Sequence, residues 1–134
     1  MQIIGHKEVS SFTCIKVATI TQIRQTPPNS YVIFTFTSKE LIDFCKQNNV
    51  KFGLIVSTLK EVIFANIHGA SFVIVDQFLC NDAQKIANEY LFDMKIFVNI
   101  KDDDTLEKFA LDGIDGVIFL ENISTQEELQ CVSL

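Results

Sequence analysis

Five short apolar runs recur at nearly equal intervals from residue 31 onward, and this repeat restricts the chain to a small set of folds. Successive runs begin between 19 and 24 residues apart, close to the shortest spacing that accommodates a strand, a helix and two turns. The runs are YVIFTF from Tyr31, FGLIV from Phe52, SFVIVD from Ser71, KIFVNI from Lys95 and GVIFL from Gly116. Such β-branched and aromatic runs are typical of parallel strands that are covered on both faces.

Helical patterns fill the intervals between these runs. Between the third and fourth runs the apolar residues form one stripe at helical spacing: Ala83, Ile86, Ala87, Tyr90 and Leu91. Similar stripes predict helices over 38–48, 58–68, 81–92 and 104–112, with a last helix over 125–132. The alternation predicts an α/β fold with a parallel sheet of five or six strands and right-handed crossovers. It leaves two arrangements open, a half-barrel and a doubly wound sheet.

The predicted helix starts share a capping-box pattern, in which a short polar residue precedes an acid or amide by three positions. The pairs are Thr37 with Glu40, Thr58 with Glu61, Asn81 with Gln84, Asp104 with Glu107, and Ser124 with Glu127. Two glycines, Gly69 and Gly113, follow predicted helices where a left-handed closing residue is expected.

The chain is expected to form one domain over 1–134, with regular βα units over 31–121 and a C-terminal helix over 122–134. Residues 1–30 are an irregular segment or an extra unit. In one interpretation Phe12 to Val17 is a strand, Thr19 to Gln25 a short helix and Pro27-Pro28-Asn29 a turn. In the other, residues 3–15 form a hairpin.

Composition argues against several kinds of partner. Seventeen acidic and eleven basic residues give a net charge of -6, which repels nucleic acid and anionic membranes. No stretch reaches the ~18 apolar residues that span a bilayer, and the N-terminus has no leader pattern. The four cysteines lie far apart without metal-ligand spacing, which predicts reduced core thiols in a cytoplasmic protein.

Ligands of parallel α/β folds bind where strands end and helices begin. The residues expected there are Thr37, Ser38, Ser57, Thr58, Asp76, Gln77, Lys101, Asp102, Asp103, Asp104, Glu121 and Asn122. None of these loops contains a glycine, so the backbone cradle that holds dinucleotides, nucleoside triphosphates or sugar phosphates is missing. We therefore expect no organic cofactor.

Asp76 is the strongest single candidate, because it ends an otherwise apolar strand at this edge. Together with Asp102 and Glu121 it could hold Mg²⁺, which needs one or two carboxylates and several waters. The alternative is that Asp76 caps a turn and that the acidic run from Asp102 to Asp104 is a solvated helix start.

The remaining polar residues suggest no catalytic set. Lys101 has the place of a Schiff-base lysine, but three adjacent aspartates would raise its pKa where that chemistry needs a lowered one. Among the histidines, His6 is isolated, and His68 before Gly69 is explained as a helix-end residue. No nucleophile elbow and no Ser-His-Asp or Cys-His arrangement is present.

The helix starts and the segments IHGASFVIVD and LDGIDGVIFL resemble the short repeating units of aldolase-type (βα)₈ barrels over about residues 31–121. Eight units do not fit at this spacing, so the resemblance implies a barrel fragment of about half. The lysine and the phosphate-binding glycines of that family are missing, and the resemblance therefore implies no catalysis.

A second resemblance is to response-regulator receiver domains, in length, in the βα units and in Asp76 at the end of the third run. Thr37-Ser38 replaces the acidic pair of that family, and Glu121 replaces its lysine. The resemblance thus implies a degenerate receiver without phosphoryl transfer.

Together these features predict a non-enzymatic module that binds another protein or itself. A half-barrel with helices on one side would leave its inner sheet face bare, and a homodimer would cover it. The alternative is a barrel-derived enzyme, or a protein that binds a small ligand or Mg²⁺ at the carboxyl ends of the strands.

Overall fold

Seven parallel strands form one curled sheet in residues 1–127, the part of the chain that the computed structural model describes. The strand order is β1-β7-β6-β5-β4-β3-β2, so neighbours from β2 to β7 are also neighbours along the chain. The strands are β1 (Gln2–Ile4), β2 (Cys14–Lys16), β3 (Tyr31–Thr35), β4 (Phe52–Ile55), β5 (Phe72–Val75), β6 (Lys95–Asn99) and β7 (Gly116–Ile118).

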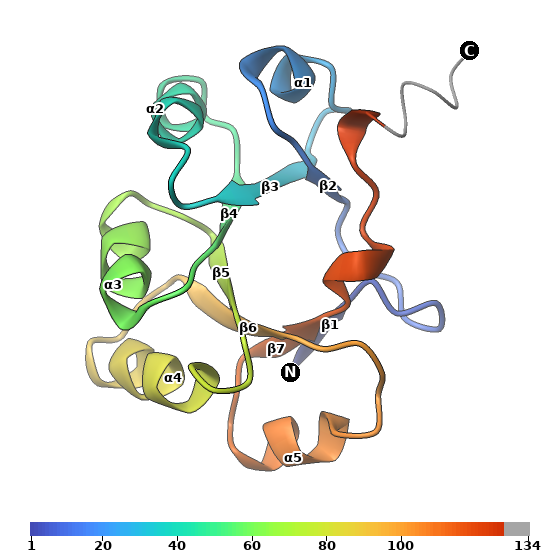
Figure 1. The fold of residues 1–134 in the computed structure, drawn as a ribbon, viewed down its shortest axis with the longest axis vertical. Coiled ribbons are helices and arrows are strands. Elements are labelled where there is room, and N and C mark those ends of the chain that lie inside the picture. Colours follow the sequence, from blue (N-terminus) through green and yellow to red (C-terminus); the bar gives the residue numbers. More distant parts are fainter. Residues whose placement is uncertain (128–134) are drawn as a thin grey trace.

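The helices lie on the outside of the curl (Figure 1). They are α1 (Ile20–Arg24), α2 (Lys39–Gln47), α3 (Leu59–Ile67), α4 (Cys80–Glu89) and α5 (Leu106–Leu111). The 3₁₀ helix η1 (Leu120–Asn122) follows β7 and lies on the inner side of the curl. This arrangement confirms the predicted α/β class with parallel strands. The predicted helix over 125–132 lies largely outside the described residues.

The strand order distinguishes the two arrangements that the sequence leaves open. A doubly wound sheet reverses its progression at a switch point and carries helices on both faces. Here the order from β2 to β7 runs in one direction and the helices cover one face, which is the half-barrel arrangement. The receiver-like alternative is therefore wrong.

The first thirty residues supply two strands, which is why the sheet has seven strands and not five or six. The predicted strand and short helix correspond to β2 and α1. The alternative hairpin is wrong, because β1 and β2 lie at opposite edges of the sheet. No sequence pattern marks β1, whose three residues pair with β7 from Gln2 opposite Gly116 to Ile4 opposite Ile118.

Two phenylalanine rings lie in the hydrophobic cluster on the inner face of the curl, each facing a glycine on a neighbouring strand. Phe72 lies opposite Gly53, Phe97 lies opposite Gly116, and the two ring centroids are 4.9 Å apart. A Cβ on Gly53 would overlap the Phe72 ring, and one on Gly116 would lie 2.8 Å from Phe97. The glycines thus make the room that lets the sheet close around these rings.

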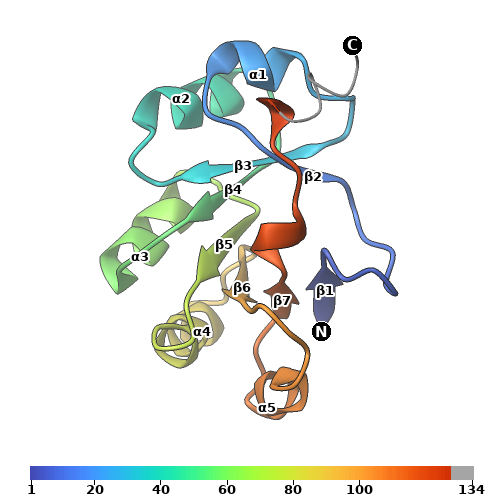
Figure 2. The same ribbon diagram turned by 45° about the vertical axis from the view of Figure 1, so that its right-hand side comes forward.

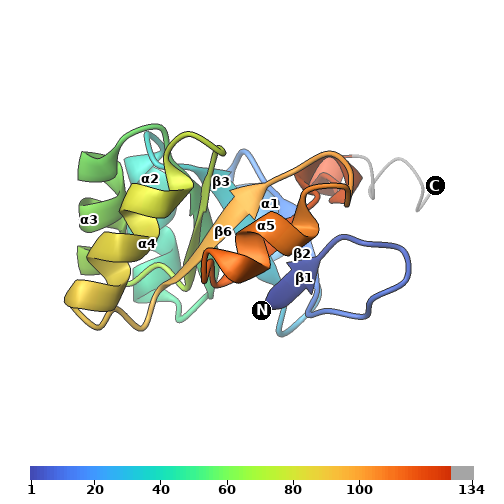
Figure 3. The ribbon, with the colours of Figure 1, turned by 90° about the horizontal axis from the view of Figure 1, so that it is seen from below.

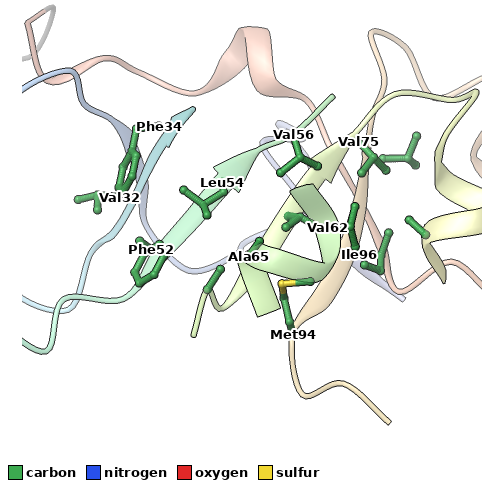
Figure 4. Close-up of a cluster of buried hydrophobic side chains, with 14 of the residues drawn as sticks. Val32, Phe34, Phe52, Leu54, Val56, Val62, Ala65, Val75, Met94 and Ile96 are labelled. Atoms are coloured by element: carbon green, nitrogen blue, oxygen red, sulfur yellow. The ribbon is translucent and has the colours of Figure 1, made fainter. Parts of the chain in front are cut away.

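The larger part of the core lies between the outer sheet face and the helices. Figure 4 shows this layer, in which Leu54 and Ile96 of the sheet face Val62 and Ala65 of α3. All four side chains are buried. Because both faces of the sheet are buried, the strands are apolar at nearly every position and do not alternate between apolar and polar residues.

Residues 119–125 connect the two edges of the sheet (Figures 2 and 3). The amide of Phe119 donates to the carbonyl of Ile4 on β1 at 2.9 Å, and the amide of Lys16 on β2 donates to the carbonyl of Ser124 at 2.9 Å. Ile123 packs on the inner cluster. The inner face is therefore covered by the chain itself, and the expectation of a bare face is wrong.

One of the predicted capping boxes forms in the described residues. The amide of Glu61 donates to Thr58 Oγ1 at 3.2 Å, and Glu61 Oε1 accepts from the amide of Ser57 at 3.0 Å. A second box, which the patterns missed, opens α1, where Gln22 and Thr19 make the equivalent pair of bonds.

Three of the predicted boxes are wrong. The helices α2, α4 and α5 follow Ser38, Leu79 and Thr105, and none of these three side chains makes a capping bond. The fifth pair, Ser124 with Glu127, belongs to a helix that extends beyond the described residues. Capping patterns locate these helices to within a few residues without identifying their caps.

Gly69 and Gly113 close α3 and α5 in the left-handed region, as predicted, with φ of 86° and 76°. The corresponding position after α2 is Asn49, and after α4 it is Leu91, with φ of 55° and 53°. A leucine at this position is unusual, because its Cβ makes the left-handed conformation costly.

We predict that Gly53→Ala lowers the free energy of unfolding by about 1–3 kcal/mol, because the new methyl group overlaps the Phe72 ring. In a Phe72→Leu background, which lacks the overlapping ring atoms, the same substitution is expected to cost less. A double-mutant cycle in urea measures the difference. An equal cost in both backgrounds would contradict the packing described for the inner face.

Candidate functional site

The chain itself occupies the carboxyl ends of the strands, where the sequence predicts a ligand. Lys16, on β2, donates from Nζ to the carbonyl of Leu120 at 3.2 Å. The amide of Leu120 donates to Asn99 Oδ1, at the end of β6, at 3.3 Å. Leu120 also packs on the inner cluster. Polar side chains at this edge thus hold η1 in place.

Asp76 caps the turn that leads into α4. Its Oδ1 accepts from the amides of Phe78 and Leu79, both at 2.9 Å. This is the structural alternative that the sequence left open for Asp76. Phe78 lies in this turn, just before the N-terminal end of α4, and is 97% exposed.

The acidic run after β6 is also engaged locally. Asp102 Oδ1 accepts from the amide of Asp104 at 3.0 Å. Asp103 Oδ2 lies 3.2 Å from His6 Nε2, and His6 Nδ1 accepts from the amide of Glu8. This pattern assigns the proton to Nε2, which donates to Asp103. The sequence suggested that His6 is isolated. In the structure, its contact with Asp103 connects the segment after β1 to the loop after β6.

Glu121 and Lys101 form an exposed ion pair at 3.7 Å. Such a pair adds little stability. Lys101 is 79% exposed, so it lacks the desolvated pocket that a Schiff-base lysine requires.

The three metal candidates do not form a cluster. Asp76, Asp102 and Glu121 each have the separate local partner described above. Within residues 1–127, no three histidine, cysteine or acidic side chains are placed to share a metal ion.

Three cysteines are free and buried, as predicted for core thiols. Burial raises the pKa of Cys14 to about 12 and that of Cys45 to about 11. Burial also raises the pKa of Cys80, and the nearby charge of Asp112 adds to this effect. Thiols of this kind are unreactive at neutral pH. Cys131 lies outside the described residues.

His68 is the C-terminal capping residue of α3, as the sequence predicts. Its ring lies 6.3 Å from that of Phe36, which also stacks on Phe64. These contacts support the outer side of α3.

The most unusual surface lies on the outside of α3 and at the end of α4. We call it the α3–α4 apolar surface, and it consists of Ile63, Phe64, Ile67, Tyr90 and Leu91, all of them exposed. The two helices contact each other and lie side by side (Figures 1 and 3). Both run back from the carboxyl edge of the sheet, so Ile67 and Tyr90 lie at the same end of the pair.

Two of these five residues, Tyr90 and Leu91, belong to the apolar stripe that the sequence predicts between the third and fourth runs. The structure buries two other residues of that stripe, Ala83 and Ala87, and on α3 it buries Val62 and Ala65. The sequence of α3 has apolar residues on every side of the helix. A helix that buries one stripe needs apolar residues on one side only, so the others are left at the surface.

Comparison with known proteins gives no relative from which a site could be transferred. No known family matches this sequence, and no curated protein is significantly similar to it. In residues 1–127, each helix is too short or too polar to cross a bilayer.

We predict that Asp76→Ala lowers the free energy of unfolding by about 1 kcal/mol, because two amides at the start of α4 lose their acceptor. Asp76→Asn keeps an oxygen at the same place and is expected to cost less. Urea unfolding compares the two variants. If Asp76 were instead a metal ligand, Mg²⁺ would raise the melting temperature of the parent protein and both variants would lose that rise.

Proposed function

We propose that this protein is a non-enzymatic self-associating module and that a second copy of the chain binds at the α3–α4 apolar surface. The observation that carries the proposal is Leu91, a leucine that is 85% exposed and has a left-handed backbone. The conformation costs about 1 kcal/mol in a residue with a Cβ. Glycine closes α3 and α5 at the same position without that cost.

The neighbours of Leu91 extend this surface. Tyr90 is 72% exposed and Ile67 is 69% exposed, and neither fills a space in the core of the single chain. Large apolar side chains grouped in this way are typical of protein interfaces, where tyrosine is enriched.

Charges around the surface favour a second copy in a two-fold arrangement. Neither α3 nor α4 has a basic residue in its last turn to offset the negative end of the helix dipole. Glu89 and Asp93 add negative charge at this same end. If two copies of α3 pack antiparallel about a two-fold axis, the exposed Lys60 at the start of one helix approaches the acidic end of the other.

The carboxyl edge supports a role without catalysis. The place where barrel enzymes hold their substrate is occupied by Leu120, which Lys16 and Asn99 hold through its backbone. The free thiols fit the reducing cytoplasm that we infer as the location.

Ile67→Lys tests the proposed interface, because it places a charge at the centre of the surface without touching the core. We expect the parent protein to be a dimer at tens to hundreds of micromolar by light scattering, and the variant to be a monomer with an unchanged melting temperature at low concentration. Phe78→Lys is the matched control, since Phe78 is also a large apolar residue and is exposed at the other end of α4.

A parent protein that is monomeric throughout this range would refute self-association. A parent dimer that Phe78→Lys dissociates and Ile67→Lys leaves intact would mean that another surface is used.

Leu91→Gly separates two effects of this residue, the backbone strain in the monomer and the apolar contact in the dimer. The free energy of unfolding of the monomer is expected to rise by about 1 kcal/mol, because glycine adopts the left-handed conformation without strain. Dimer dissociation is expected to become easier, because the apolar side chain is lost. Dilution series followed by sedimentation and by chemical unfolding measure both changes. A lower stability together with unchanged association would contradict the role given to Leu91.

A further inference from the structure

A pocket of about 360 Å³ lies between α1, α2 and the loops that lead into β3 and β4. It is at the amino-terminal edge of the sheet, opposite the edge where a ligand was expected. Its walls include Arg24, Phe44, Lys51 and Ser30. The volume is within the range of pockets that bind small molecules.

The charges of this pocket contrast with those of the whole chain. Two cationic residues and no acidic residue of the described part of the chain line it, although the net charge of the protein is -6. The Arg24 guanidinium lies 5.4 Å from the centroid of the Phe44 ring, and Lys51 Nζ lies 5.4 Å from that of Tyr31. Among the described residues, neither cation has a carboxylate within 4.0 Å.

The carbonyl ends of α1 and α2 also border the pocket and would repel an anion if they were free. Local side chains engage one carbonyl at each end. Thr26 Oγ1 donates to the carbonyl of Ile23 at 2.7 Å, and Asn48 Nδ2 donates to that of Phe44 at 2.8 Å. These two bonds offset part of the negative charge at the helix ends.

Ser30 provides a second, independent observation. The residue is only 7% exposed, and among residues 1–127 its Oγ has no hydrogen-bond partner. A buried hydroxyl without a partner is rare and unfavourable in a native protein. An acceptor oxygen of a ligand in the pocket would satisfy it once the Ser30 side chain turns toward the ligand, since Oγ is out of contact with solvent in the free protein.

The backbone around the pocket is held in uncommon conformations. Asn29 and Asn49 both line it, and both are left-handed, with φ of 67° and 55°. Pro27 and Pro28 restrict the loop before Ser30. Asparagine adopts this conformation readily, and Asn49 does so as the closing residue of α2.

We propose that this pocket binds a small organic anion, whose carboxylate or phosphate group is held by Arg24 and Lys51 and accepts a hydrogen bond from Ser30 Oγ. The Phe44 ring, which lines the pocket, positions the Arg24 guanidinium, and the amides of Asn29 and Asn49 offer further hydrogen bonds to the polar body of the ligand. The pocket is built from other elements than the α3–α4 apolar surface, so the proposal stands independently of self-association.

Titration calorimetry with succinate and with inorganic phosphate, each against chloride at equal ionic strength, tests the proposal. We expect saturable binding of at least one probe. Lys51→Gln and Arg24→Gln are each expected to weaken it at least about tenfold, the usual effect of losing a charge-assisted hydrogen bond. Lys46→Gln, which removes the same charge from α2 outside the pocket, is the matched control. Binding of succinate alone indicates a carboxylate ligand, and binding of phosphate alone indicates a phosphorylated one.

The Ser30→Ala variant distinguishes a hydroxyl that binds the ligand from one that only supports the fold. We expect the melting temperature of the free protein to stay the same or rise, because an unpartnered buried hydroxyl is removed, while affinity for the probe falls several-fold. A lower melting temperature with unchanged affinity would overturn the role of Ser30. Absence of saturable binding for both probes, or equal weakening by Lys46→Gln, would overturn the site.

Discussion

Contact between the rings of Phe72 and Phe97 inside the curled sheet is the interaction on which the other features depend. Each ring fits because the neighbouring strand has a glycine directly opposite, Gly53 for one and Gly116 for the other. The pairs close the space inside the curl with side chains of the sheet itself. A parallel sheet of this size thus covers its inner face within one chain.

This packing determines which surfaces remain for function. The inner face is closed, and the segment after β7 is held across the carboxyl edge by Lys16 and Asn99. Two features are left with properties that folding does not explain. One is the apolar outer side of α3 with Leu91 after α4, and the other is the cationic pocket that contains the unpartnered Ser30 hydroxyl. Both lie away from the edge that parallel α/β enzymes use.

The sequence predicted the strands from Tyr31 onward and the helices between them, because period and apolar content report burial directly. It missed β1, since three residues paired only at one edge carry no periodic signal. It placed Leu91 in the apolar stripe of α4, because helical spacing alone does not show that the helix ends before this residue. The pocket could not be foreseen, because Arg24 and Lys51 are brought together only when β3 and β4 pair.

Amide hydrogen exchange at several protein concentrations tests most directly whether the inner face is covered within one chain. We expect the amides of β5 and β6 to be the most strongly protected in the sheet, and their protection to persist after dilution below the concentration at which dimers dissociate. Loss of that protection on dilution would mean that a second copy is needed to close the inner face, and would contradict the packing of Phe72 against Phe97 as the basis of the fold.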